Sequence, residues 1–152
     1  MSAEYDDQRK RFFDAAISGN IQALKEMLDS GYRVNRGDAH LYTALHRVCE
    51  NWEDDGPGNQ RAWASASFLV SQGANVNADN PAMDGWTPLH LSCWSGSFFA
   101  VKFLLTHGAR PDYRDWYGKY EATKSYDKPT NKMAQMQPLC HITFSSIPRR
   151  NT

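Results

Sequence analysis

Histidine and cysteine are the residue types through which this chain could hold a metal or catalyse a reaction. Its five histidines and three cysteines are dispersed, and His40, His107 and His141 have no cysteine or carboxylate neighbour at the spacing of a metal site. The sequence contains no glycine-rich phosphate loop, nucleophile elbow or catalytic acid–base pair. We therefore expect no catalytic, metal-binding or cofactor-binding residues, no cofactor and no small-molecule substrate.

An internal repeat places two of the histidines at equivalent positions. Phe13, His46, His90 and Thr123 are in phase, with spacings of 33, 44 and 33 residues, so the period is about 33. The longer spacing contains a nine-residue insertion inside the second unit and two further residues before the third. Such periods predict a row of stacked structural units, because one unit cannot bury its apolar side alone.

Local signals in the third unit predict two short antiparallel helices. Pro88 suits the first turn of a helix, and Thr87 before it is a suitable N-cap. Gly96 ends that helix, and the apolar run 101–105 indicates a second. Gly108 then suits the left-handed conformation that follows a helix.

The motif Thr87-Pro88-Leu89-His90, followed by Gly108-Ala109, resembles the core of an ankyrin repeat. The resemblance implies an all-α ankyrin-repeat solenoid of stacked helix-turn-helix units with projecting hairpin fingers. It comprises three clear repeats and a degenerate fourth, in which Tyr120-Glu121-Ala122-Thr123 replaces the motif. The resulting division is a flexible N-terminus (1–7), repeats over 8–126 (8–37, 38–79, 80–112 and a partial 113–126), a C-terminal cap (127–137) and an extended tail (138–152).

Charge and terminal composition narrow the classes of partner. The 17 basic and 17 acidic side chains cancel, which argues against a nucleic-acid or membrane-surface binder. The first residues lack the basic and apolar regions of a secretory signal, and no apolar run reaches about 20 residues. We expect an intracellular, cytoplasmic protein, with nuclear or cytoskeletal association left open, whose Cys49 and Cys93 are buried and reduced.

The resemblance also implies a concave groove, lined by the fingers and the first helix of each repeat, where partners bind. Its histidines, His46 and His90, would tie the fingers to the helices. The groove positions are unusually aromatic, and aromatic side chains are frequent interface anchors. We expect a partner to contact residues from this set: Ile17, Ser18, Ala39, His40, Tyr42, Glu50, Met83, Asp84, Trp86, Trp94, Ser95, Trp116, Tyr117 and Lys119. The alternative is that Trp86 and Trp116 pack on adjacent fingers or against the C-terminal segment.

The nine-residue insertion falls near residues 51–59. Its acidic run and Gly-Pro-Gly predict a surface loop. The loop is either a tolerated insertion or a second contact, with Trp52 as the anchor and Glu53, Asp54 and Asp55 facing a basic partner.

These observations predict a non-catalytic protein–protein interaction module, monomeric within a larger hetero-complex as a subunit or scaffold. Two alternatives remain. The chain could be an adaptor or inhibitor that presents or blocks an enzyme, like ubiquitin-ligase adaptors or kinase inhibitors. It could also be a methyl-lysine reader in which Trp86, Trp94 and Trp116 form a cage beside Asp84 or Glu50.

Overall fold

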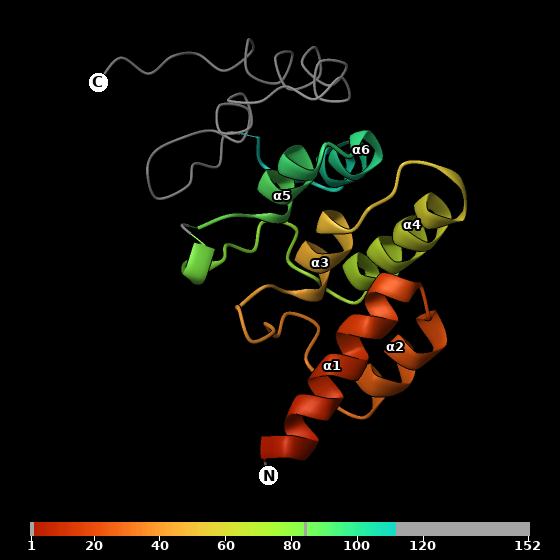
Figure 1. Ribbon diagram of the computed structural model, residues 1–152, viewed down its shortest axis with the longest axis vertical. Helices are drawn as coiled ribbons and strands as arrows, with labels where there is room; N and C mark the ends of the chain where they lie inside the picture. The colour runs from red at the N-terminus through yellow and green to blue at the C-terminus, as the bar shows by residue number, and fades with distance from the viewer. Residues whose placement is uncertain (1, 84, 112–152) are drawn as a thin grey trace.

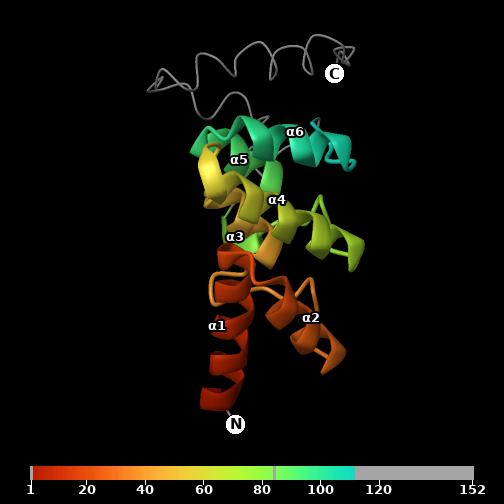
Figure 2. The same cartoon turned by 90° about the vertical axis from the view of Figure 1, so that its right-hand side faces the viewer.

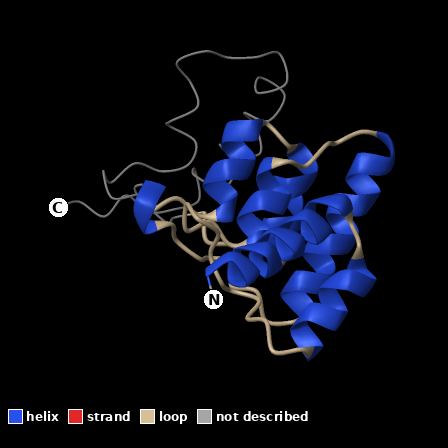
Figure 3. Cartoon of the chain, turned by 60° about the horizontal axis from the view of Figure 1, so that its bottom comes forward, coloured by secondary structure: helices blue, strands red, loops and turns tan. Residues whose placement is uncertain are grey.

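Three helical hairpins in a row make up the part of the chain that the computed structural model describes, residues 2–83 and 85–111 (Figure 1). The helices are α1 (Ser2–Ser18), α2 (Ile21–Asp29), α3 (Ala44–Glu50), α4 (Gly56–Ser71), α5 (Pro88–Ser95) and α6 (Phe98–Thr106), with a 3-10 turn η1 (Pro81–Met83). Figure 3 shows no strand in these residues. The expected all-α solenoid is confirmed.

The helices form two rows. Helices α1, α3 and α5 pack on one another as the inner row, and α2, α4 and α6 lie beside them as the outer row (Figure 2). Two long connecting segments, finger 1 (30–43) and finger 2 (72–87), project to the side away from α4 (Figure 1). Finger 2 is closed by an isolated antiparallel bridge between Asn80 and Trp86.

Helices α3 and α5 begin with the same capping arrangement. The Thr87 hydroxyl accepts the His90 N–H at 3.5 Å, and His90 Nδ1 accepts the Thr87 N–H at 3.0 Å. Thr43 and His46 repeat this pair at the start of α3. Reciprocal capping satisfies two of the backbone donors that a helix start leaves unpaired. The predicted cap at Thr87 and the helix start at Pro88 are confirmed.

The ring of His46 also joins two repeats. Its Nδ1 accepts the Thr43 N–H, so the proton lies on Nε2, which donates to the Trp86 carbonyl at 3.0 Å. The imidazole therefore ties finger 2 to α3, as expected of this histidine. Burial is the largest cause that lowers the His46 pKa, to about 4, so the ring is neutral at pH 7.

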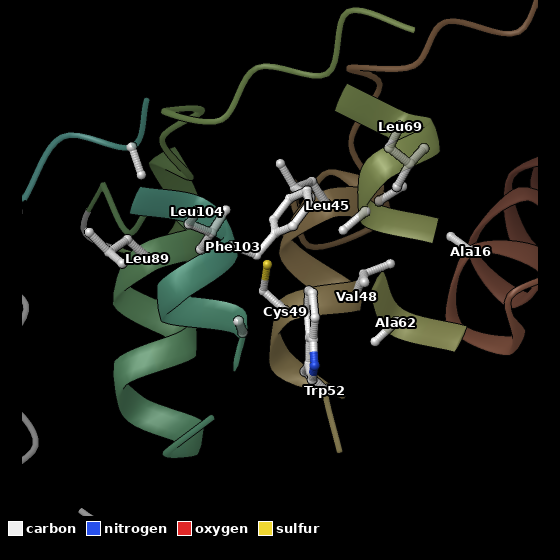
Figure 4. Packing of buried hydrophobic residues seen from close by; sticks show 14 of the residues in the cluster. Ala16, Leu45, Val48, Cys49, Trp52, Ala62, Leu69, Leu89, Phe103 and Leu104 are labelled. Atoms are coloured by element: carbon white, nitrogen blue, oxygen red, sulfur yellow. The ribbon is translucent and has the colours of Figure 1, made fainter. Parts of the chain in front are cut away.

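Small side chains on the inner row allow the helices to approach closely. Ala16, Cys49 and Cys93 occupy equivalent positions and are buried (Figure 4). Phe103 and Leu104 of α6 belong to the same hydrophobic core and are fully buried. Burial raises the pKa of the Cys49 thiol to about 12, so this cysteine is a protonated core residue rather than a nucleophile.

Asparagine side chains link successive repeats at the base of the fingers. Asn35 Nδ2 donates to the Gly73 carbonyl at 3.0 Å, and Asn35 Oδ1 accepts the Asn75 N–H at 2.7 Å. Asn77 forms the same pair with the next repeat, donating to the Gly108 carbonyl at 3.1 Å and accepting the Arg110 N–H at 2.8 Å. Each amide thus fixes the register of one repeat on the next.

Two expectations about local structure are wrong. Residues 2–7, expected to be flexible, form the first turns of α1, where Arg9 pairs with Asp6 at 2.7 Å and the Arg36 guanidinium stacks 3.7 Å from the centre of the Tyr5 ring. The expected loop at 51–59 ends at Asp55, because Gly56-Pro57-Gly58 begin α4. Proline is compatible with a first turn, where its missing N–H has no intrahelical partner.

The insertion therefore lengthens a helix. Helix α4 has 16 residues, whereas α2 and α6 have nine each. The expected partial repeat (113–126), cap (127–137) and tail (138–152) lie outside the described residues.

Candidate protein-binding surface

The inner face of the molecule is defined here by Ile17, Glu50 and Trp94 on the inner helices and by His40, Leu41, Met83 and Trp86 on the fingers. Ile17, Glu50 and Trp94 each follow the reference position of their repeat by four residues, so they form a line across α1, α3 and α5. Trp94 is 58% exposed and Ile17 41% exposed. The apolar side chains of the first and third repeats, with Glu50 between them, form a surface on which a partner could bury apolar area.

Two tryptophans lie together on the third repeat. The rings of Trp86 and Trp94 are 5.9 Å apart between centroids, at 60°, an edge-to-face contact. Trp86 also stacks on the His90 ring at 6.0 Å and is half-buried. Trp94 is therefore the accessible member of the pair, and Trp86 supports it from below.

Tyr42 was expected on the binding surface but is buried, with 6% of its surface exposed. Its ring packs against His46 at 5.5 Å, and the Arg47 guanidinium covers it at 4.3 Å from the ring centre. Burial raises the pKa of the Tyr42 phenol, with the Glu50 charge acting in the same direction. Tyr42 thus serves the packing of finger 1 against α3.

Arg47 organises the charges beside Tyr42. It binds Asp38 and Glu50, each at 2.7 Å. Asp38 in turn accepts the N–H groups of His40 and Tyr42, which shapes finger 1. The two carboxylates and one guanidinium leave this cluster with a net charge of −1. Glu50 is the more exposed carboxylate, at 38% of its side chain against 16% for Asp38.

Trp52 was expected to anchor a partner, and this expectation is wrong. Trp52 is 5% exposed and lies against Phe103, at 5.7 Å between ring centroids (Figure 4). Its ring also contacts Trp63, at 6.0 Å between centroids. The indole N–H donates to Asn59 Oδ1 at 2.9 Å. The residues of the insertion therefore satisfy the polar edge of the ring inside the chain itself.

Asp54 also makes its contacts inside the chain rather than with a partner. Its carboxylate accepts the Ser97 hydroxyl at 2.5 Å and the Phe98 N–H at 2.9 Å. Both donors lie at the start of α6, where a negative charge is favourable. Segment 51–55 is thus a brace from the second repeat to the third. Neither the tolerated-insertion nor the partner-contact interpretation anticipated it.

A family model described as ankyrin repeats (3 copies) matches residues 12–115, more than half of the chain. The chain belongs to the ankyrin-repeat family. Ankyrin repeats form a non-catalytic module for protein–protein interaction, which agrees with the inner face described above. The described residues include no cluster of three or more metal-binding side chains, and none of their helices combines the length and apolarity of a membrane span.

Three curated relatives illustrate the settings in which similar ankyrin repeats occur. The chain is 46% identical over 70 residues to human ankyrin repeat and MYND domain-containing protein 1, 34% over 101 to mouse RelA-associated inhibitor, and 31% over 100 to palmitoyltransferase Hip14 of Drosophila melanogaster. These matches cover 46%, 63% and 66% of this chain but only 7%, 10% and 14% of the relatives. The chain therefore spans a small part of the length of these ankyrin proteins.

Of the predicted site residues, the structure brings Trp86 and Trp94 together. His40 and Met83 are exposed and Glu50 is partly exposed, whereas Tyr42 and Trp52 are buried. Asp84, Trp116 and Tyr117 lie outside the described residues. The Trp86 and Trp94 rings contact each other, so a methylammonium group has no space between them. Glu50, named as a cage carboxylate, is bound by Arg47.

Leu41 was missed as a binding residue. It is 49% exposed at the tip of finger 1 and has a φ of 63°, the left-handed region that leucine rarely adopts. The repeat register contained the signal, because Leu41 occupies the position of Gly85, whose φ is 78°. A large apolar residue thus occupies, in a strained backbone conformation, the place where the next repeat has a glycine.

Proposed function

We propose that this ankyrin-repeat chain binds a protein partner through its inner face, with Trp94 as the main anchor. The observation that carries the proposal is the exposure of Trp94 on α5, where its ring contacts Trp86; Leu41 and Met83 on the fingers are also exposed. An indole that is buried on association can contribute about 2 kcal/mol or more to the binding free energy. Ile17 extends this surface to the first repeat.

The setting we propose is a larger intracellular, cytoplasmic assembly in which the chain is a monomeric subunit or scaffold. The curated relatives support a larger setting only in that this chain matches 7 to 14% of their length, so each of them has further parts beyond the matched residues. The balanced charge of the sequence favours a protein partner over nucleic acid or a membrane surface. An adaptor or inhibitor role would use the same face, with an enzyme as the partner.

The test compares proteins that co-purify with the wild type and with Trp94→Ala, measured by quantitative mass spectrometry. We expect the recovered amount of specific partners to be at least about tenfold lower with Trp94→Ala than with the wild type, because the anchoring indole is lost. Lys102→Ala is the control, since it truncates an exposed long side chain on the outer helix α6 of the same repeat. Equal recovery of the same proteins with the wild type and Trp94→Ala would contradict the proposal.

Trp86 is less suitable than Trp94 for this test. Its ring packs on His90, so Trp86→Ala removes contacts within the fold as well as a surface group. Trp94→Ala leaves the folded chain nearly unchanged, because substitutions of exposed residues usually alter stability by less than about 0.5 kcal/mol. A melting temperature equal to that of the wild type confirms that any loss of binding belongs to the surface.

A further inference from the structure

From the line formed by Ile17, Glu50 and Trp94 we infer the chemistry of the partner: a linear segment with a lysine or arginine between two apolar residues. The cationic side chain lies at Glu50, and the apolar residues lie at Trp94 and beside Ile17. This inference rests on the proposed function and adds which kind of segment the inner face selects.

The charge expected of the partner's central residue follows from the charges around Arg47. Arg47 is already bound by Asp38 and Glu50, so the cluster keeps one negative charge, and Glu50 is its more exposed carboxylate. Among the described residues, only Arg47 donates to Glu50. A cation from a partner would bring the cluster to neutrality, whereas an anion at this place would be repelled. Charge complementarity of this kind determines the choice of partner more than the total affinity.

The two apolar contact points of the inner face lie on either side of Glu50. Trp94 presents its exposed indole on α5, and Ile17 presents its side chain on α1. A hollow of about 350 Å³ lies next to Ile17, and Val48 and Ala62 also line it. Gly58 and four polar residues complete the lining of this hollow: Ser18, Asn51, Glu53 and Arg61. The hollow has room for one side chain of a bound segment, whose apolar contacts would be Ile17, Val48 and Ala62.

The repeat sets the spacing between these three points. Neighbouring packed helices lie about 8–10 Å apart, so the Glu50 position is about that far from the Ile17 position on α1 and from the Trp94 position on α5. An extended segment covers this distance in about 3 residues and a helix in about 6. Both spacings fit within a segment of about 16 residues.

The probe is a phage-displayed library of random 16-residue peptides selected on the immobilised wild-type chain. We expect enriched sequences with lysine or arginine between two apolar residues, at one of the two spacings. Glu50→Lys should shift the central preference to aspartate or glutamate. The matched control is Glu26→Lys, the same charge change on the outer helix α2, which should leave the preference unchanged.

Affinity measurements on the best peptide separate the contributions. By fluorescence anisotropy we expect Trp94→Ala to weaken binding at least about tenfold and Glu50→Gln about threefold, with the second effect shrinking as salt is added. Thermal melts of each variant establish that it is folded.

The outcomes distinguish the inference from the proposed function. Peptides that need Trp94 but carry a neutral or acidic centre overturn the inference and leave the binding role of the inner face intact. Peptides that bind Trp94→Ala as well as the wild type overturn both. A library that yields no enriched sequence overturns the inference, since it requires a linear segment. The co-purification experiment then decides the proposed function independently.

Discussion

His46 shows how one side chain can fix both a helix start and the neighbouring finger. Its ring bonds to Thr43 within its own repeat and to the Trp86 carbonyl in the next one. The two bonds together require the neutral tautomer with the proton on Nε2, because Nδ1 must accept the Thr43 N–H. Protonation would add a donor where an acceptor is needed and would place a charge inside a fully buried site.

The free energy of unfolding should therefore depend on pH through the titration of His46. Its pKa falls from 6.5 to about 4 on folding. The unfolded chain thus takes up a proton first, and the stabilisation present above about pH 6.5 is lost as the pH falls towards 4. Urea unfolding should give a free energy about 2 kcal/mol lower at pH 5 than at pH 7 from this group. His40→Gln, an exposed control, should keep the full loss, and His46→Gln should lack this part of it. An equal loss in wild type and His46→Gln would refute the assignment.

Leu41 holds backbone strain at the surface. With a φ of 63°, leucine places its Cβ close to the carbonyl oxygen. Leu41→Gly should relieve this strain and raise the unfolding free energy by up to about 1 kcal/mol, measured by urea titration. Leu41→Ala keeps a Cβ at the same φ and should give no such gain. If alanine stabilises as much as glycine, exposed apolar area rather than the backbone is the cause.

At the scale of elements, the connection between α3 and α4 is the main departure from a regular repeat. It places Trp52 under Trp63 and Phe103 and brings Asp54 to the start of α6. The carboxylate thereby satisfies backbone and side-chain donors of a helix in another repeat. The added residues support the neighbouring repeat rather than extend a loop into solvent.

Removal of this carboxylate should destabilise the third repeat. Asp54→Ala leaves the Ser97 hydroxyl and the Phe98 N–H without their acceptor, and we expect a loss of about 1–2 kcal/mol in unfolding free energy. Asp55→Ala is the matched control, because Asp55 is exposed and its side chain caps nothing. Chemical denaturation of both variants gives the comparison. If the two variants lose the same small amount, Asp54 is not a brace.

The sequence predicted the elements whose signals are local and periodic. Thr87, Pro88 and Gly96 define a helix within ten residues, and the repeat then places its copies. Contacts between residues far apart in the sequence could not be predicted from these local signals. Trp52 meets Phe103 and Asp54 meets Ser97 only after the repeats have stacked. Trp52 was consequently assigned to the surface, as an aromatic residue in a polar segment resembles an interface anchor when its neighbours in space are unknown.

At the scale of the whole molecule, the repeats are joined by a small set of recurring bonds. Asn77→Asp should weaken the joint between the second and third repeats by about 1–2 kcal/mol in a urea titration, because a carboxylate cannot donate to the Gly108 carbonyl. Asn75→Asp provides the control. Asn75 is exposed, and its side-chain oxygen accepts the Asn77 N–H, a bond that an aspartate oxygen can also accept. Similar losses in both variants would mean that added negative charge, rather than the missing donor, weakens the joint.

The Asp54 contact to α6 also affects how often the third repeat opens locally in the unbound protein. In a stacked array each unit is held by its neighbours, and amide hydrogens exchange earliest where the contacts between units are few. An additional contact on α6 slows local opening of the repeat that displays the Trp94 indole. The ring is then already oriented when an association partner arrives, and less ordering entropy is lost on contact.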